Sequence, residues 1–309
     1  MSKMATRTAY GKALAKLIVE RDDIVVLDAD LTKSTKTGDA QKACPERHFN
    51  IGIAEGNMMS IAAGLAASKK VVYASSFAMF AAGRAFEQIR NSIAYPNLNV
   101  KICATHAGIT VGEDGASHQA IEDLALMRSI PNMKVFQPCD AKQTEMIIKA
   151  VADLQGPCYV RLGRGNVEDV YTDDTAFTFG KGNVLRQGKE VAVFATGMMV
   201  QEVLLAAEIL KKDSISITVI DMPTIKPIDE QLICRIAKDH SLLVSCEEHN
   251  IIGGLGSAIA EVLCEKCPVR LVRIGMQDCF GESGTPEALL RKYELDGESI
   301  AQRIIGYIK

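Results

Sequence analysis

The segment 105–119, which reads THAGITVGEDGASHQ, gathers two histidines and two acidic residues among three glycines. It follows an apolar run and precedes a helical pattern. We therefore place it in a loop at the carboxyl end of a strand, where loops carry function more often than packing. His106 and His118 could act as general acids, general bases or hydrogen-bonding groups near neutral pH. A metal site of His106, Asp114 and His118 is conceivable, but the spacing fits no known closed site. A solvated loop is the simplest alternative.

Glu55 stands at the start of a strongly apolar helical pattern that runs over 56–67. A carboxylate in the first turn of a helix is stabilised by the helix dipole by about 0.3–1 kcal/mol, and this is its ordinary role. The second interpretation is catalytic, because a carboxyl shielded by apolar neighbours can hold or give a proton at neutral pH. The spacing of the residues alone leaves both roles open.

Other chemical motifs in the sequence are weaker. Cys264 and Cys267 form a single Cys-x-x-Cys pair within a predicted helix, and without a second pair at zinc spacing, packing explains them better than redox or metal chemistry. Residues 253–256 (GGLG) could hold an anion at a helix N-terminus, but they do not match the dinucleotide fingerprint. Residues 247–249 (EEH) could form a ligand site at a strand end, although a structural or interface role is the simpler interpretation.

The elements that must position these residues alternate between short β-branched runs and longer amphipathic patterns. This alternation is typical of a parallel sheet with helices on both faces, whose strand C-termini meet at one ligand-binding edge. In the first half of the chain the predicted strands are 24–27, 71–74, 100–104, 133–136 and 158–162. The predicted helices there are 8–20, 56–67, 81–93, 120–129 and 141–154.

The periodic pattern stops between 163 and 189, where five glycines and the acidic pair 173–174 occur. A second series then begins, with strands predicted at 191–195, 215–220, 241–246 and 269–274, and with a helix that Asp229 caps. The fold class is therefore α/β, with two consecutive three-layer αβα domains that each contain a mainly parallel sheet. We expect the domains to be 1–165 and 190–309, joined by a linker over 166–189.

The composition is that of an ordinary globular protein. The chain has 309 residues, of which 48% are hydrophobic and 24% charged, with a net charge of -3. These values argue against disorder and against a basic surface for nucleic acid. No 18 apolar residues run together, so no membrane span is expected. Nine cysteines in a chain without a recognisable signal peptide predict reduced thiols and a cytoplasmic location.

Four segments, in the right order along the chain, resemble the transketolase family. The similarity covers essentially the whole chain and corresponds to the C-terminal half of a transketolase, that is, its pyrimidine-binding domain followed by its C-terminal domain. The loop 105–119 is the most specific of the four, although 107–108 (AG) replaces the family's Asp-Ser and 116–117 (AS) replaces Pro-Thr. The segments are 29–34 (ADLTKS), 52–55 (GIAE), 76–80 (SFAMF) and 105–119.

The resemblance implies thiamine diphosphate as the cofactor, with Mg²⁺ at its diphosphate. Glu55 would hydrogen-bond the ring nitrogen of the aminopyrimidine and favour the imino form, which takes the proton from the thiazolium carbon. Phe77 and Phe80 would cover the pyrimidine, although their i, i+3 spacing alone would also suit a core stripe. Asp30 would lie beside the thiazolium ring and the subunit boundary.

The resemblance also implies a set of substrate-binding groups. Asp114 and His118 would bind donor hydroxyls near the scissile carbon–carbon bond, and with Glu55 they are the expected catalytic residues. Arginine forks suit a phosphate dianion. The implied reaction transfers a two-carbon ketol unit from a ketose phosphate to an aldose phosphate. The residues expected to hold the sugar phosphate are His106, Arg164, Arg7 and Ser34.

The sequence lacks one motif of full-length thiamine enzymes, the Gly-Asp-Gly followed by Asn that holds Mg²⁺ and the diphosphate. Residues 112–115 (GEDG) are a different motif. The resemblance therefore implies a split transketolase, in which this chain is the C-terminal subunit and provides no metal ligand. An N-terminal partner subunit would supply the Gly-Asp-Gly motif and hold the metal and the diphosphate. We expect a heterotetramer of two copies of each chain that acts on sugar phosphates, with neither nucleic acid nor a membrane as a partner.

Three alternatives remain. The chain could be part of an enzyme like 1-deoxyxylulose-5-phosphate synthase, or the β subunit of a 2-oxo acid dehydrogenase, although the loop 105–119 favours transketolase over both. A non-catalytic scaffold subunit is the alternative from another functional class. It predicts the loss of Glu55, Asp114 or His118, and all three are present.

Overall fold

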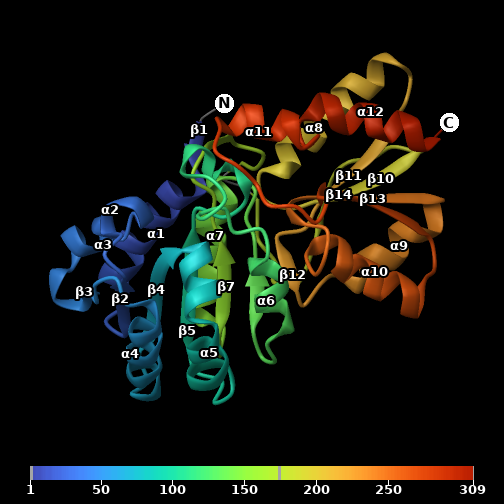
Figure 1. The fold of residues 1–309 in the computed structure, drawn as a ribbon. Helices are drawn as coiled ribbons and strands as arrows, with labels where there is room; N and C mark the ends of the chain where they lie inside the picture. Colours follow the sequence, from blue (N-terminus) through green and yellow to red (C-terminus); the bar gives the residue numbers. More distant parts are fainter. Residues whose placement is uncertain (1–2, 173–174, 309) are drawn as a thin grey trace.

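The computed structural model describes residues 3–172 and 175–308, and within these ranges the chain forms two α/β units (Figure 1). The first unit contains a seven-stranded sheet with the order β12-β6-β7-β5-β4-β2-β3. Every neighbouring pair is parallel except β12 with β6. The strands are β2 (Ile24–Asp28), β3 (His48–Asn50), β4 (Val71–Phe77), β5 (Val100–Thr105), β6 (Lys134–Phe136), β7 (Cys158–Arg161) and β12 (Thr224–Lys226).

The second unit contains a five-stranded sheet with the order β14-β13-β10-β11-β9. Only the edge strand β9 runs antiparallel to its neighbour among the described pairs. The strands are β9 (Asn183–Arg186), β10 (Val191–Ala195), β11 (Ile217–Asp221), β13 (Leu242–Asn250) and β14 (Arg270–Met276). The predicted α/β class with mainly parallel sheets is confirmed.

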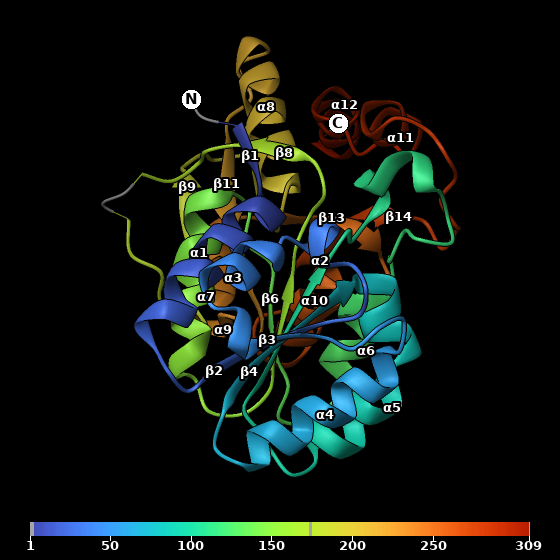
Figure 2. The same ribbon diagram turned by 90° about the vertical axis from the view of Figure 1, so that its left-hand side faces the viewer.

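Helices cover both faces of the first sheet, as Figure 2 shows. Val25 and Leu27 of β2 enter the core under α4, whereas Ile24 and Val26 enter the core under α1. Alternate residues of a strand point to opposite faces, so burial of both faces explains why the strand sequences are apolar throughout. One face carries α1 (Thr6–Glu20), α3 (Gly38–Ala43) and α7 (Ala141–Asp153), and the other carries α4 (Glu55–Ala67), α5 (Phe86–Gln88) and α6 (Asp123–Ser129).

The second sheet is covered in the same way. Val193 packs on the same side as Val203 and Ile304, whereas Phe194 packs with Ile233 and its neighbours on the other side. Asp229 caps the helix that follows it, as predicted, because its carboxylate accepts a hydrogen bond from the backbone N–H of Leu232 at 3.1 Å. The helices are α8 (Met199–Lys212) and α12 (Gly297–Ile308) on one face, α9 (Glu230–Asp239) and α10 (Leu255–Lys266) on the other, and α11 (Pro286–Lys292) at the edge.

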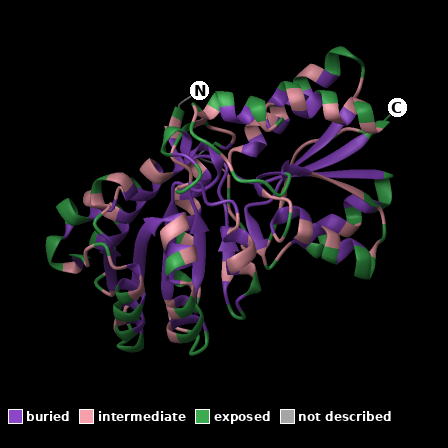
Figure 3. Cartoon of the chain, in the orientation of Figure 1, coloured by how far each residue is buried: buried purple, intermediate pink, exposed green. Residues whose placement is uncertain are grey.

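The two units share one apolar core. Strand β12 follows β11 along the chain but pairs with β6 at the edge of the first sheet. Phe194 and Ile233 of the second unit belong to the same buried cluster as Val72 and Leu124 of the first. Figure 3 shows the result, since both sheets are buried and exposed residues concentrate on the outer faces of the helices.

The structure differs from the sequence-based prediction in several places, three of which concern predicted segments. The single α-helix predicted over 81–93 is wrong, because this segment forms a π-helical turn (Met79–Arg84), the short helix α5 and a second π-helical turn (Ile89–Ala94). A π-helical turn widens the backbone and redirects the side chains. The helix predicted over 120–129 begins only at Asp123. The third difference concerns the segment between the two units.

The segment 166–189, predicted as a linker, contains two short strands. Strand β8 (Asn166–Glu168) pairs with β1 (Lys3–Ala5) near the start of the chain, and β9 forms the edge of the second sheet. Residues 173–174, the predicted acidic pair, lie outside the described residues. Within the described part of the chain, no helix is both long enough and apolar enough to cross a membrane.

Candidate active site

The predicted site residues gather at the carboxyl edge of the first sheet. Because β2, β4, β5 and β7 are parallel, the residues that end or follow them meet at one edge. Phe77 is the last residue of β4, His106 directly follows β5, and Arg164 follows β7. Glu55 begins α4, the helix after β3. Parallel pairing thus brings together side chains that lie far apart in the sequence.

Glu55 is almost completely buried, with 1% of the residue exposed. Its Oε1 accepts a hydrogen bond from Ser76 Oγ at 3.2 Å, and its Oε2 accepts one from Arg84 Nη1 at 2.7 Å. A buried carboxylate needs such partners, because an unpaired buried charge is very costly. The Arg84 guanidinium also lies over the ring of Phe80, with its central carbon 4.6 Å from the ring centroid. Arg84 therefore covers both Glu55 and one aromatic ring.

Sequence reasoning did not identify Arg84 as a site residue. Its only signal is a single arginine in the small, apolar stretch 78–86 (AMFAAGRAF). That stretch was predicted as ordinary helix, and the π-helical turn that ends at Arg84 has no recognisable sequence pattern of its own.

The aromatic side chains form one cluster. The rings of Phe77 and Phe80 lie near parallel with centroids 5.9 Å apart, and the His106 ring stacks on Phe77 at 3.8 Å. His118 approaches Phe80 edge-on at 5.4 Å. The structure thus brings the segment after β4 against the loop after β5.

Arg7 connects the start of α1 to this cluster. Its Nη1 donates to the carbonyl oxygen of Ser34 at 3.0 Å and lies 3.2 Å from His106 Nε2. Arginine can only donate, so Nε2 of His106 accepts and its Nδ1 carries the proton, which it donates to Thr105 Oγ1 at 2.8 Å. The expected group of Arg7, Ser34 and His106 is therefore assembled in this chain.

Arg164 is the second guanidinium of the site. It donates to the carbonyl oxygen of Val111 and to Glu113 Oε2 at 3.2 Å, and it lies 3.9 Å from Asp114 Oδ2. Burial and the charge of Arg164 lower the pKa of Arg7. Among the described residues, the buried Nε of Arg7 has no hydrogen-bond partner. Two neighbouring guanidinium groups with a free donor are suited to an anion such as a phosphate.

The remaining predicted residues lie at the rim. His118 is half-buried and its Nδ1 lies 2.9 Å from Ser117 Oγ, whereas Asp114 is exposed. Asp30 is also exposed and contacts Asn50, with its backbone N–H 3.0 Å from Asn50 Oδ1.

The buried position of His106 leads to a prediction about how the stability of the chain depends on pH. Burial, followed by the charges of Arg7, Arg164 and His118, lowers its pKa to about 3. In the unfolded chain the histidine has an ordinary pKa of about 6.5. As the pH falls, the unfolded chain therefore takes up a proton at His106 at a higher pH than the folded chain does. The free energy of unfolding should therefore decrease from about pH 6.5 towards pH 3.

Urea unfolding at a series of pH values checks this expectation. His106→Asn should lose stability less steeply than the wild type over that range. Burial also lowers the pKa of His249, to about 4. His249 therefore contributes to the pH dependence of the free energy of unfolding in both proteins alike, and the difference between them reports on His106. Identical slopes for the two proteins would show that His106 protonates freely in the folded state.

Glu247 and His249 have a structural role. Glu247 accepts hydrogen bonds from the backbone N–H groups of Leu255 and Gly256 at 2.7 and 2.8 Å, at the first turn of α10. His249 is buried, and its Nδ1 lies 2.6 Å from the carbonyl oxygen of Asn250. The contacts of Glu247 join β13 to α10, in line with the structural interpretation of this segment.

Comparison with known proteins identifies relatives along the whole chain. Residues 2–169 match the model of the transketolase pyrimidine-binding domain, and residues 180–300 match that of the transketolase C-terminal domain. A protein from Methanocaldococcus jannaschii, whose name describes it as the C-terminal section of a transketolase, is 52% identical over 98% of this chain and 96% of its own length. Human transketolase is 38% identical over 99% of this chain, which spans 49% of the human protein.

A solved structure resembles the whole chain. It is described as a split gene transketolase in an inactive β4 tetramer, and it has 52% sequence identity to this chain. The TM-score is 0.90, with 99% of both chains covered. The resemblance drawn from the four sequence segments is therefore confirmed.

Proposed function

The chain belongs to the transketolase family, as the C-terminal part of a split member, and from this premise we propose that it is the C-terminal subunit of a thiamine diphosphate-dependent transketolase. The proposed reaction transfers a two-carbon ketol unit from a ketose phosphate to an aldose phosphate. One observation carries the proposal. A buried carboxyl, an aromatic pair and two arginines from separate elements share one edge of the first sheet.

The residues of this chain fit the aminopyrimidine end of the cofactor. Glu55 would hold the proton at the ring nitrogen, and Phe77 and Phe80 would cover the ring face. When bound, thiamine diphosphate supplies the electron sink that stabilises the carbanion left when a bond beside a carbonyl breaks. Because Arg84 covers Glu55, its guanidinium has to move aside before the ring can reach the carboxyl.

The described residues do not offer the other end of such a site. They contain no group of three or more histidine, cysteine or acidic side chains that could hold a metal ion. In keeping with the family resemblance, we assign Mg²⁺ and the diphosphate to an N-terminal partner subunit, in an assembly of two copies of each chain. The description of the similar solved structure, a split gene product that is inactive as a β4 tetramer, supports this division.

The substrate would lie over the loop after β5. Arg7, His106 and Arg164 would hold the sugar phosphate, with Ser34 fixing Arg7 through its carbonyl oxygen. His118 and Asp114, at the rim of the same loop, would bind the donor hydroxyls next to the bond that breaks. Asp30 would meet the partner subunit at the thiazolium end.

The test combines this chain with an N-terminal subunit that carries the Gly-Asp-Gly motif, together with thiamine diphosphate and Mg²⁺, and assays ketol transfer between pentose phosphates. We expect activity only when both chains are present. Activity of this chain alone would contradict the split site. An inactive pair that still forms a stable complex would favour the scaffold alternative.

Removing an arginine from the site gives a more specific prediction. In the reconstituted enzyme, Arg7→Ala or Arg164→Ala should each remove about 2 kcal/mol of charge-assisted binding to a phosphate. The KM for a ketose phosphate should rise about 30-fold. Each variant should leave the KM for a ketol donor without phosphate, such as hydroxypyruvate, nearly unchanged. An equal rise for both donors would mean that the arginine supports the fold and does not bind phosphate.

A further inference from the structure

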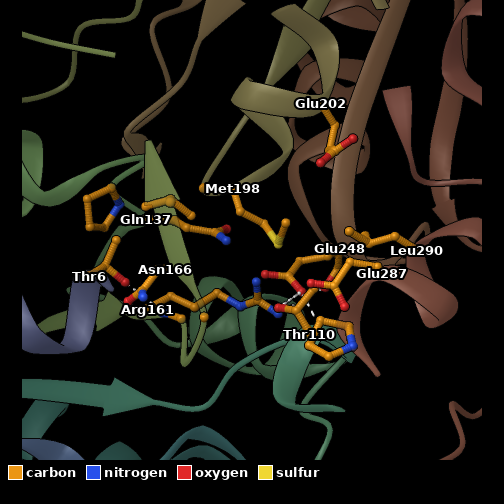
Figure 4. A pocket seen from close by; sticks show the side chains of 16 residues that line it. Thr6, Thr110, Gln137, Arg161, Asn166, Met198, Glu202, Glu248, Glu287 and Leu290 are labelled. Carbon is orange, nitrogen blue, oxygen red and sulfur yellow. Dashed lines mark hydrogen bonds between the residues drawn. The ribbon is translucent and has the colours of Figure 1, made fainter. Parts of the chain in front are cut away.

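A cavity of about 220 Å³ lies between the two units; Glu55, Phe77 and Phe80 do not line it, although its lining includes Thr6 and Gly163, the chain neighbours of Arg7 and Arg164. Figure 4 shows Arg161 of β7 along one side, with its guanidinium next to Glu248 of β13 and Thr110. Glu202 of α8 points in from the opposite side, past Met198. A cavity needs only about 10–15 Å³ to hold one water, so this one is large enough for a small molecule.

Arg161 leaves a buried donor facing the cavity. Only 1% of the residue is exposed. Its Nε donates to both carboxylate oxygens of Asp123, and its Nη2 donates to the carbonyl oxygens of Ala120 and Glu248 at 3.0 and 3.2 Å. Among the described residues, Nη1 has no partner. Because a buried N–H without an acceptor is unfavourable, this end of the cavity favours a ligand with a carboxylate.

For two carboxyl groups of the cavity, only one oxygen has a hydrogen-bond partner among the described residues. Glu248 uses Oε2 for the backbone N–H and the hydroxyl of Thr110, at 3.2 and 2.7 Å. Glu202 uses Oε2 for the backbone N–H of Gly297 at 2.7 Å. Burial raises the pKa of both Glu202 and Glu248, so a bound cation would stabilise their ionised forms.

The charges of the lining define the ligand. Asp123 forms an ion pair with Arg161 at 2.9 Å, whereas no ion pair of Glu202 or Glu248 is found among the described residues. Glu287, the remaining acidic residue of the lining, is exposed. A complementary molecule therefore carries a carboxylate for Arg161 Nη1, one ammonium group for Glu248 beside it, and a second for Glu202 across the cavity. The half-buried Met198 between them suits an aliphatic chain.

We propose that this cavity binds a basic amino acid, with its α-carboxylate on Arg161, its α-ammonium on Glu248 and its side-chain ammonium on Glu202. No bond is made or broken, and the binding does not depend on the proposed ketol transfer. If the cavity does not bind a basic amino acid, the proposed ketol transfer is unaffected, and the reverse also holds.

The experiment uses L-lysine and three matched analogues in thermal unfolding and calorimetric titration of the purified chain. Cadaverine lacks the carboxylate, 6-aminohexanoate lacks the α-ammonium, and norleucine lacks the side-chain ammonium. We expect saturable binding of L-lysine, with each analogue at least 10-fold weaker. No saturable binding of lysine overturns the proposal. Cadaverine binding as tightly as lysine overturns the assignment of Arg161, because a diamine has no group for it.

Two glutamates on the same helix, α8, give a matched pair of variants. Glu202→Gln should abolish the preference for lysine over norleucine and leave norleucine binding unchanged. Glu208→Gln, at an exposed pair with Arg186 on the outer surface, should keep the full preference. If both variants keep the preference, lysine binds elsewhere and the proposal is wrong.

Discussion

Replacing Glu55 with glutamine is expected to lower the rate of ketol transfer by the reconstituted enzyme about 10²–10⁴-fold, the usual range for loss of a general acid–base group. Glutamine has nearly the same shape; its one carbonyl oxygen can accept the hydrogen bond that Arg84 donates to Glu55, and its amide NH₂ can donate to Ser76 Oγ, because a hydroxyl can accept as well as donate. It cannot hold a titrating proton. The loss should therefore fall on kcat with the fold intact.

The matched control is Glu87→Gln, which changes an exposed glutamate that bonds only to its neighbours Gln88 and Asn91 in the described part of the chain. This variant should keep wild-type activity. Thermal unfolding of both variants separates a catalytic loss from a folding defect. If Glu55→Gln retained full activity, Glu55 would be a buried structural carboxylate that Arg84 neutralises and nothing more.

Local sequence patterns predicted the parallel strands, except β3, and most of the helices, because both faces of β2, β4 and β5 are buried and their residues are apolar throughout. The position of the site at the carboxyl edge followed from the same parallel order. These features depend on periodicity and on chain direction, which a single sequence contains.

The features that were missed depend on contacts between distant segments. The pair of Arg84 with Glu55 joins two helices across the sheet edge, and the π-helical turn that permits it has no pattern of its own. Strand β12 is only three residues long and pairs with β6 of the other unit. Whether such a short segment forms a strand depends on tertiary packing and not on the local preference of its residues. The cavity beside Arg161 likewise exists only because the two units meet.

The ion pair between Arg161 and Asp123 lies at that meeting point and should contribute strongly to stability. Both side chains are 1% exposed, with Arg161 Nε 2.9 Å from Asp123 Oδ2. Tyr159 also donates its hydroxyl to Asp123 at 2.7 Å. Asp123→Ala should lower the free energy of unfolding by about 3–5 kcal/mol, because it leaves a buried guanidinium without its counter-charge. Against a typical total of about 5–15 kcal/mol, this loss is large.

Urea unfolding with linear extrapolation measures this loss, and an exposed ion pair provides the control. Glu261 pairs with Arg128 at 2.7 Å, but its side chain is 64% exposed, so Glu261→Ala should cost no more than about 1 kcal/mol. The double variant Asp123→Leu with Arg161→Met should be more stable than Asp123→Ala alone, because it removes both charges and keeps the volume. If Asp123→Ala and Glu261→Ala lost the same small amount, water would reach Arg161 in the folded chain, and its free Nη1 would no longer require an anion in the cavity.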